Sequence, residues 1–265
     1  MCTLLTRARS RAAGNYQVLF GMDEIKIFKN SDDLSKKVGQ VWSDLARGAD
    51  AAGHGLSVAL SGGNTAHVVN RYLAGSRFRD SIPWNSVQLF WGDERCVPPD
   101  HSESNYGMVK KALIDCVRIP AANIHRIRGE DPPGEEAHRY AKEIQGFLGT
   151  ENNGIPEFDW ILLGMGEDGH TASLFPGGGL VEEDLGICGV ARHPGTGQDR
   201  VTLTLPVLMK ARRVTFLVIG EAKAEIISKI HLSHGTDHLP AARVRNGTGL
   251  VEWYLDAPAA SLLTR

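Results

Sequence analysis

Apolar residues follow two patterns in this chain, and the patterns alternate along most of its length. Short apolar runs are typical of buried strands, and apolar residues that recur every three or four positions are typical of amphipathic helices. Their alternation predicts an α/β fold, in which a largely parallel sheet is covered by helices on both faces. The predicted strands are residues 25–28, 56–60, 87–91, 158–163, 201–205, 214–219 and 251–255. One predicted helix begins at a cap formed by Asn30 or Ser31, and the others span residues 67–73, 106–117, 135–148 and 222–230.

Three of the predicted strands end in loops rich in glycine and polar residues, at residues 61–65, 92–98 and 164–170. Open α/β sheets bind their ligands at the carboxyl ends of parallel strands. If these three strands are parallel, their loops meet at one edge of the sheet. The sequence therefore predicts a site at this edge.

Composition is that of an ordinary globular protein, and the charge balance narrows the choice of ligand. The chain has 265 residues, 42% hydrophobic and 23% charged, and its 29 basic and 31 acidic side chains give a net charge of −2. Proteins that bind nucleic acid usually show a basic excess or patch, so we expect a small anion and no nucleic acid. No apolar stretch approaches the ~20 residues that span a bilayer, so we expect no membrane contact.

The first 22 residues differ from the rest, because arginines lie among small residues and no acidic residue precedes Asp23. We expect residues 1–22 to be a disordered extension, with an organelle-targeting peptide as the alternative. Residues 23–265 contain no repeat and no long polar linker, which predicts one α/β domain. The four cysteines form no CxxC pair, so we expect reduced thiols and a cytoplasmic location. The expected assembly is a monomer or a weak homodimer.

The loop after the strand at residues 158–163 carries a carboxylate and an imidazole two positions apart, Asp168 and His170. A histidine in such a loop can accept a proton from water near neutral pH. Asp168 can orient this histidine and stabilise the imidazolium that forms. The alternative is a turn in which Asp168 caps the next helix and His170 bonds only to the backbone.

The loop at residues 61–65 has the features of an anion-binding turn. Its glycines expose backbone N–H groups, the following helix N-terminus adds about half a positive charge, and two hydroxyls add donors. The loop lacks the lysine of a Walker motif and does not read GxGxxG, so we expect no nucleotide cofactor. A tight turn with Asn64 or Thr65 as helix cap is the alternative. The candidate residues are Ser61, Gly62, Gly63, Asn64 and Thr65.

Three basic residues are candidates for binding phosphate. Arg95 follows two acidic residues after a predicted strand and suits bidentate phosphate recognition, with a structural ion-pair cluster as the alternative. Arg200 opens another predicted strand, and Lys223 lies in the first turn of a predicted helix, where a bound anion would offset its repulsion by the helix dipole. Solvated surface charge is the alternative for both. No His, Cys, Asp and Glu set has the spacing of a metal site, so we expect no metal.

Five segments form an ordered set of motifs. The first is Ser-Gly-Gly-Asn-Thr at residues 61–65. The second is Gly-Asp-Glu-Arg at 92–95, together with Val-Pro at 97–98, His101 and Ser-Asn at 104–105. The other three are the glycine-rich segment at 164–176, Arg-Val-Thr-Leu-Thr-Leu-Pro at 200–206 and Leu-Pro-Ala-Ala at 239–242. Together they resemble the 6-phosphogluconolactonase family, from about residue 25 to near the C-terminus. Five motifs in order are far more specific than any one loop.

The resemblance implies hydrolysis of 6-phospho-D-glucono-1,5-lactone to 6-phospho-D-gluconate, in the oxidative pentose phosphate pathway, without a metal. It also implies a Rossmann-like α/β fold that is shared with glucosamine-6-phosphate deaminases. Carried over by motif, His170 is the catalytic histidine, which we expect to act as general base. Residues 61–65, Arg95, Arg200 and Lys223 become candidates for contacts with the substrate and its phosphate.

Two segments depart from the family's pattern. Asn64 and Ala66 stand where the family often has Ser and Pro, and residues 193–199 differ from a proline-rich stretch. The nearest alternative function is that of the related deaminases, but the residues after His170 lack the Asn-Glu pair of that group. A second alternative is a sugar-phosphate sensor without activity, which would tolerate loss of His170.

Overall fold

The computed structural model describes residues 10–12, 15–20, 23–149, 154–181, 186–245 and 247–263. Its main sheet has the strand order β1-β2-β3-β11-β10-β7-β4-β5. The six strands from β3 to β5 are parallel, and β2 and β1 extend the β3 edge in antiparallel fashion. The predicted largely parallel α/β fold is therefore confirmed. The strands are β1 Ser10–Ala12, β2 Asn15–Phe20, β3 Asp23–Phe28, β4 Leu56–Leu60, β5 Val87–Trp91, β7 Trp160–Leu163, β10 Arg213–Val218 and β11 Leu250–Asp256.

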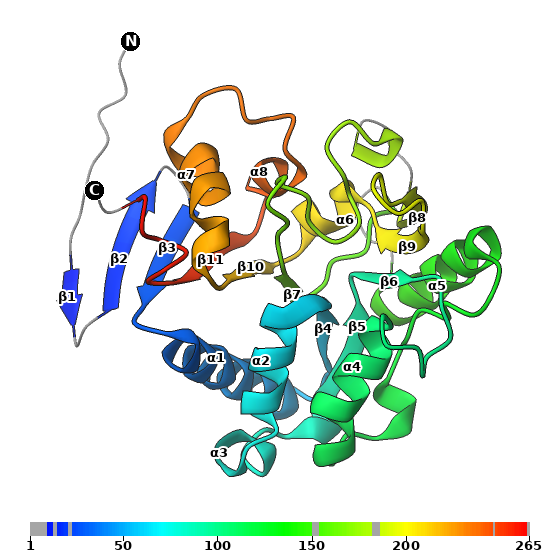
Figure 1. The fold of residues 1–265 in the computed structure, drawn as a ribbon. Coiled ribbons are helices and arrows are strands. Elements are labelled where there is room, and N and C mark those ends of the chain that lie inside the picture. The colour runs from blue at the N-terminus through cyan, green and yellow to red at the C-terminus, as the bar shows by residue number, and fades with distance from the viewer. Residues whose placement is uncertain are drawn as a thin grey trace.

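Helices cover both faces of this sheet, with α1 and α2 below it and α7 and α8 above it in Figure 1. On the lower face, Trp42 of α1 packs edge-on against Trp160 of β7, at 5.6 Å between ring centroids. Trp160 donates a hydrogen bond to Thr215 of β10, whereas the next residue, Phe216, stacks on Trp253 at 3.9 Å on the other face. Successive residues of a strand point to opposite faces, so both layers are buried cores. The helices are α1 Ser31–Ala51, α2 Gly63–Leu73, α3 Ser76–Arg79, α4 Asn105–Ala112, α5 Pro133–Leu148, α6 Leu205–Lys210, α7 Ala224–Leu232 and α8 Pro240–Val244.

Most predicted elements are present, with shifted ends. Asn30 caps α1, because its side chain accepts a hydrogen bond of 2.9 Å from the N–H of Asp33. The helix α2 begins four residues before the predicted residue 67, so it includes part of the loop at 61–65. This earlier start decides how that loop contributes to the site.

One predicted strand belongs to a different sheet. Residues 201–205 were expected in the main sheet, but β9 (Asp199–Leu203) pairs antiparallel with β6 (Asp93–Arg95) and β8 (Cys188–Arg192) in a three-stranded sheet. The residues from 200 to 203 are all buried. An apolar run of this kind predicts a buried strand without indicating its partners.

The N-terminal segment differs in part from the expected disordered extension. Residues Ser10–Ala12 and Asn15–Phe20 form β1 and β2, and β2 pairs with β3. This pairing satisfies backbone groups of β3 that an edge strand would leave open. Residues 1–9, 13–14 and 21–22 lie outside the described residues, and the division at residue 22 stays a prediction.

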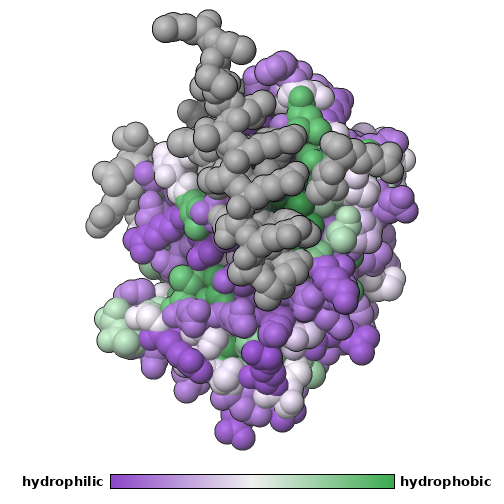
Figure 2. Space-filling view, turned by 90° about the vertical axis from the view of Figure 1, so that its left-hand side faces the viewer, coloured by the Kyte–Doolittle hydropathy of each residue, from purple (hydrophilic) through white to green (hydrophobic). Residues whose placement is uncertain are grey.

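The surface seen from the β1–β2 side is mainly hydrophilic where described residues form it, with small apolar patches (Figure 2). Scattered apolar patches are normal on globular proteins. Within the described ranges, no helix has both the length and the apolar character needed to cross a bilayer.

The buried His231 of α7 should make folding sensitive to acid. It packs edge-on against Trp253 at 4.7 Å, and burial together with the charge of Arg245 lowers the pKa of His231 to about 3. An unfolded histidine titrates near ~6.5, so the unfolded chain binds the extra proton as the pH falls from about 6.5 toward 3. Acidification from pH 7.5 to pH 5 should therefore lower the unfolding free energy by about 2 kcal/mol through His231.

The measurement is urea denaturation at both pH values for the wild type, His231→Phe and the exposed-histidine control His54→Gln. His231→Phe should lose about 2 kcal/mol less on acidification than the other two proteins. Equal losses in all three would show that His231 does not set the acid sensitivity.

Candidate functional site

A cleft of about 440 Å³ lies where the parallel strands β4, β5 and β7 end. Nine of the ten residues predicted for the site line it, and the tenth, Asp168, bonds to the cleft residue His170. The structure thus brings the three loops together, as the sequence predicted. Further lining residues, which the sequence analysis did not select, are Asp93, Asn105, Gly164, Met165, Gly166, Glu167, Ala172, Ile219 and Ala222.

The imidazole of His170 is oriented by Asp168. Asp168 Oδ1 lies 2.6 Å from Nδ1 of His170 and also accepts the His170 backbone N–H at 3.1 Å. Burial alone would raise the pKa of Asp168, but these bonds and the charge of His170 bring that pKa below its ordinary value. An ionised Asp168 holds the proton of a neutral imidazole on Nδ1 and leaves Nε2 as the acceptor.

Gly166 leaves room for this pair. A Cβ atom at position 166 would lie 2.2 Å from Nδ1 of His170 and 2.4 Å from Oδ1 of Asp168. Distances this short exclude any side chain at this position unless the pair separates. The glycine of the motif is therefore a steric requirement of the Asp168–His170 contact.

Two side-chain hydrogen bonds hold the loop that carries His170, one within the loop and one to Asp93. Thr171 Oγ1 donates to the carbonyl of Gly164 at 2.8 Å, and Ser173 Oγ donates to Asp93 Oδ2 at 2.6 Å. Between them, Ala172 has a φ of 48°, which is strained for a residue other than glycine. Asp168 caps no helix here, because the next helical turn of the described chain is the 3₁₀ helix Gly179–Val181.

The motif at residues 239–242 also supports this loop. The N–H of Ala241, in α8, donates to the carbonyl of Gly169 at 3.1 Å. A Cβ atom at Gly169, whose φ is +83°, would lie 3.0 Å from the side chain of Leu239. The Leu-Pro-Ala-Ala motif therefore shapes the loop that carries His170 from outside the cleft.

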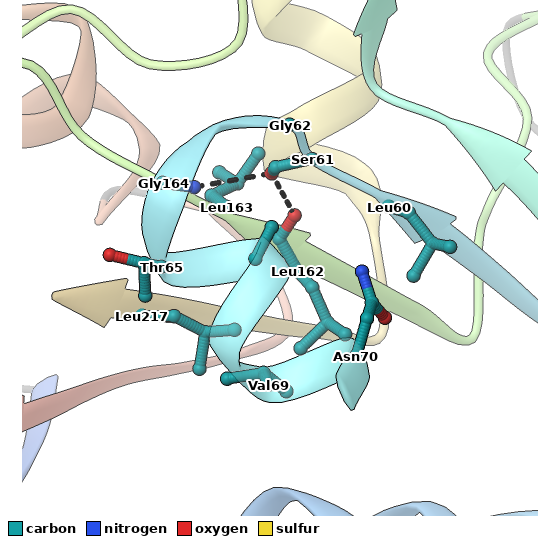
Figure 3. Close-up of a pocket in the computed structure, with 11 residues that line it drawn as sticks. Leu60, Ser61, Gly62, Thr65, Val69, Asn70, Leu162, Leu163, Gly164 and Leu217 are labelled. Atoms are coloured by element: carbon teal, nitrogen blue, oxygen red, sulfur yellow. Dashed lines mark hydrogen bonds between the residues drawn. The ribbon is translucent and has the colours of Figure 1, made fainter. Parts of the chain in front are cut away.

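Ser61 joins the ends of β4 and β7, as Figure 3 shows beside the small apolar pocket under α2. Its Oγ donates to the carbonyl of Leu162 at 2.5 Å and accepts the N–H of Gly164 at 3.2 Å. The hydroxyl proton is thus used inside the protein. Ser61 lines the cleft, but its hydroxyl is not the free donor that was expected from the sequence.

The N-terminus of α2 faces the cleft without a side-chain cap. Gly62 is the N-cap residue, and Asn64 and Thr65 lie in the first turn, so the alternative of a helix cap at Asn64 or Thr65 does not hold. A Cβ atom at Gly62 would lie 1.7 Å from Oδ1 of Asn105, which explains the glycine. The first backbone N–H groups of a helix are unsatisfied by the helix itself and favour an anion.

Arg95 and Arg200 face each other on paired strands. They are register partners on β6 and β9, an arrangement that is unfavourable for like charges. Arg95 donates to the carbonyl of Glu103 at 2.6 Å, whereas Arg200 is 9% exposed and its Cζ lies 5.7 Å from the ring of Phe175. Burial and the charge of Arg95 lower the pKa of Arg200.

Neither arginine of this pair has a carboxylate within salt-bridge distance among the described residues, and the Nε atoms of both are buried without a partner there. A buried and a half-buried cation without a counter-ion favour a bound anion. The alternative of a structural ion-pair cluster, in which the neighbouring acids pair with Arg95, therefore does not hold for the Arg95 side chain.

Lys223 lies in the short 3₁₀ helix Glu221–Lys223, directly before α7. Its Nζ is 3.9 Å from Oε1 of Glu167, whose side chain is 69% exposed. This contact is weak, because an exposed pair at this distance gains little. Lys223 faces the cleft as predicted, with part of its charge offset by Glu167.

The acidic residues beside Arg95 organise the loops instead. Glu94 accepts the backbone N–H groups of Arg95, Asn105 and Tyr106 at 2.7 to 2.8 Å and the hydroxyl of Ser104 at 3.0 Å. This carboxylate lies at the N-terminus of α4, where negative charge is favourable. Burial nevertheless raises the pKa of Glu94.

An α/β fold whose cleft combines an oriented imidazole, an uncapped helix N-terminus and two facing arginines is typical of an enzyme with a small anionic substrate. The chain belongs to the family of glucosamine-6-phosphate isomerases and 6-phosphogluconolactonases, whose family model matches residues 29–253. This membership confirms the resemblance found in the sequence.

Named relatives are similar over most of their length. The chain is 44% identical to the 6-phosphogluconolactonase of Haemophilus influenzae over 79% of this chain and 88% of the relative. It is 37% identical to the human 6-phosphogluconolactonase over 91% and 93%, respectively. The solved structure of the Trypanosoma cruzi 6-phosphogluconolactonase superposes with a TM-score of 0.81 at 28% identity and covers 94% of this chain and 99% of that one.

Replacing Glu94 by glutamine should destabilise the protein. The N–H groups of an amide would face the backbone N–H groups and the hydroxyl whose hydrogen bonds Glu94 now accepts. Each buried group left without a partner costs about 1–3 kcal/mol. We expect Glu94→Gln to lower the unfolding free energy by about 2–4 kcal/mol in urea denaturation. The exposed control Glu135→Gln, in the first turn of α5, should change it by less than about 0.5 kcal/mol. A Glu94→Gln protein as stable as the control would contradict the organising role of this carboxylate.

Proposed function

We propose that this protein hydrolyses 6-phospho-D-glucono-1,5-lactone to 6-phospho-D-gluconate, with His170 as general base and without a metal. One observation carries the proposal: a single cleft combines an imidazole oriented by Asp168 with the facing Arg95 and Arg200. The names of the relatives support the substrate. The proposal includes the oxidative pentose phosphate pathway as its context, a cytoplasmic location, and a monomer or weak homodimer.

In the proposed mechanism, His170 activates a water molecule. Nε2 accepts a proton from water while the water oxygen bonds to C1 of the lactone, and Asp168 stabilises the imidazolium. When the tetrahedral intermediate collapses, the C1–ring oxygen bond breaks and Nε2 returns the proton to the leaving oxygen. The net change is the addition of one water. A lactone is an activated ester, and the sequence has no Gly-x-Ser-x-Gly nucleophile elbow, so no covalent intermediate is required.

The phosphate of the substrate is the anion that suits the remaining groups. Arg95 and Arg200 provide two guanidinium groups, and the α2 N-terminus adds backbone N–H donors. Lys223 adds a third cation, although Glu167 competes for it. Of the three cations, we expect Arg200 to contribute most to phosphate binding. Its charge is buried, and it has the fewest contacts within the protein that could take the place of a bound phosphate.

Loss of the general base should slow turnover much more than it weakens binding. His170→Ala should lower kcat by about 10²–10⁴-fold with a smaller change in KM. Asp168→Asn should also lower kcat, with little change in melting temperature, because the residue orients His170 and caps no helix. The assay follows lactone loss in the presence of a chelator, with the spontaneous rate subtracted.

The wild type should be active in the same assay and should release no ammonia from glucosamine 6-phosphate. Wild-type turnover in His170→Ala would eliminate the general base. Ligand binding without turnover in the wild type would favour the sugar-phosphate sensor, and ammonia release would favour the deaminase.

Phosphate recognition should dominate product binding. 6-Phosphogluconate should inhibit at least tenfold more strongly than gluconate, and added salt should weaken its inhibition. Arg200→Met should remove at least tenfold of this preference, because it deletes a buried charge–charge interaction. Lys223→Met should have a smaller effect. Equal inhibition by the two compounds, or a larger effect of Lys223→Met, would contradict this assignment of the phosphate-binding groups.

A further inference from the structure

The ring of Phe175 contacts functional side chains from two different segments. Its centroid lies 4.9 Å from the imidazole of His170 and 5.7 Å from Cζ of Arg200. Phe175 is 5% exposed and does not line the cleft itself. It therefore lies behind the two groups that are assigned to proton transfer and to phosphate binding.

Neither group is fixed by polar contacts alone. The imidazole of His170 has one side-chain hydrogen bond among the described residues, to an Asp168 whose side chain is 49% exposed. The guanidinium of Arg200 has no hydrogen bond to a described residue. One bond leaves an imidazole free to tilt about it, so the apolar contact determines where Nε2 points. A cation over a ring face is also attracted to it.

A second histidine supports Phe175 from another segment. His193 lies edge-on to the Phe175 ring, at 5.1 Å and an interplanar angle of 76°. It begins the loop between β8 and β9, and its Nδ1 accepts the backbone N–H groups of Gly195 and Thr196, both at 3.1 Å. These two bonds fix the ring and require an unprotonated Nδ1. Burial and the charges of Arg200 and His170 also lower the pKa of His193.

We propose that Phe175 is a positioning residue, held in place by His193, that sets the orientation of His170 and the place of Arg200. The proposal uses the lactonase reaction as one readout and therefore rests in part on the proposed function. It assigns a role to residues 193–198, a segment in which this chain departs from the family's pattern. A neutral His193 adds no positive charge beside Arg200 and the imidazole of His170.

The test compares Phe175→Leu with Phe78→Leu. Phe78 is 4% exposed and packs against Tyr72, so its replacement removes the same ring from a core position that is not in contact with the cleft. Phe175→Leu should lower kcat by roughly tenfold to a hundredfold through misplacement of His170. It should also weaken inhibition by 6-phosphogluconate about threefold to tenfold through Arg200. Phe78→Leu should change the melting temperature but neither constant.

A second readout does not depend on activity. In ¹⁵N spectra of the histidine side chains, the His170 signals, assigned with His170→Ala, should report a proton fixed on Nδ1 in the wild type and in Phe78→Leu. In Phe175→Leu they should move toward the averaged values of a free imidazole. If the wild type has no lactonase activity, the proposed function fails, and these spectra still test the positioning role.

His193→Asn provides a variant in an exposed loop, in case Phe175→Leu does not fold. An asparagine can accept the same two backbone N–H groups and so keep the turn, but it removes the ring. We expect an unchanged melting temperature and a kcat about threefold to tenfold lower. A kcat within twofold of the wild type in the folded variants, with unchanged ¹⁵N signals for His170, would overturn the proposal.

Discussion

The cleft depends on two buried carboxylates that follow β5. Glu94 gathers three backbone N–H groups and a hydroxyl at the start of α4, and Asp93 accepts the hydroxyl of Ser173 from the loop that carries His170. Asn105, which bonds to both acids, also packs against Gly62 at the start of α2. Three loops distant in sequence are thus tied to one pair of side chains. Buried carboxylates are tolerated only when hydrogen bonds satisfy them, so the loops and the acids require each other.

Hydrophobic periodicity was enough to predict the parallel part of the fold. The strands that became β4, β5 and β7 are apolar runs followed by glycine-rich turns, and both features are local. The edge of the sheet at which the loops meet follows from the direction of parallel strands alone. For this reason the loops at 61–65, 92–98 and 164–170 could be placed at one edge of the sheet from the sequence, whereas Arg200 and Lys223 were assigned to the same site only through the family resemblance.

Besides β1 and β2, which form in the segment that was expected to be disordered, the errors concern strand and hydrogen-bond partners more than element types. An apolar run at residues 201–205 does not indicate that β9 pairs with β6, so the facing of Arg95 and Arg200 could not be predicted. The roles of Ser61 and Glu94 also depend on groups distant in sequence, because Ser61 bonds to both Leu162 and Gly164. In the sequence, Phe175 is one residue of the segment at 164–176, and only its contacts with His170, His193 and Arg200 distinguish it. Long-range contacts of this kind leave no periodic signal in the sequence.

The central claim is that one cleft places the reacting carbonyl at His170 and the phosphate at the facing arginines. The most direct test is a crystal structure of the wild-type protein with 6-phosphogluconate bound. The account predicts a carboxylate oxygen of the product within hydrogen-bond distance of Nε2 of His170, and phosphate oxygens bonded to Arg95 and Arg200. A product bound with its carboxylate away from His170, or with its phosphate away from both arginines, would contradict it.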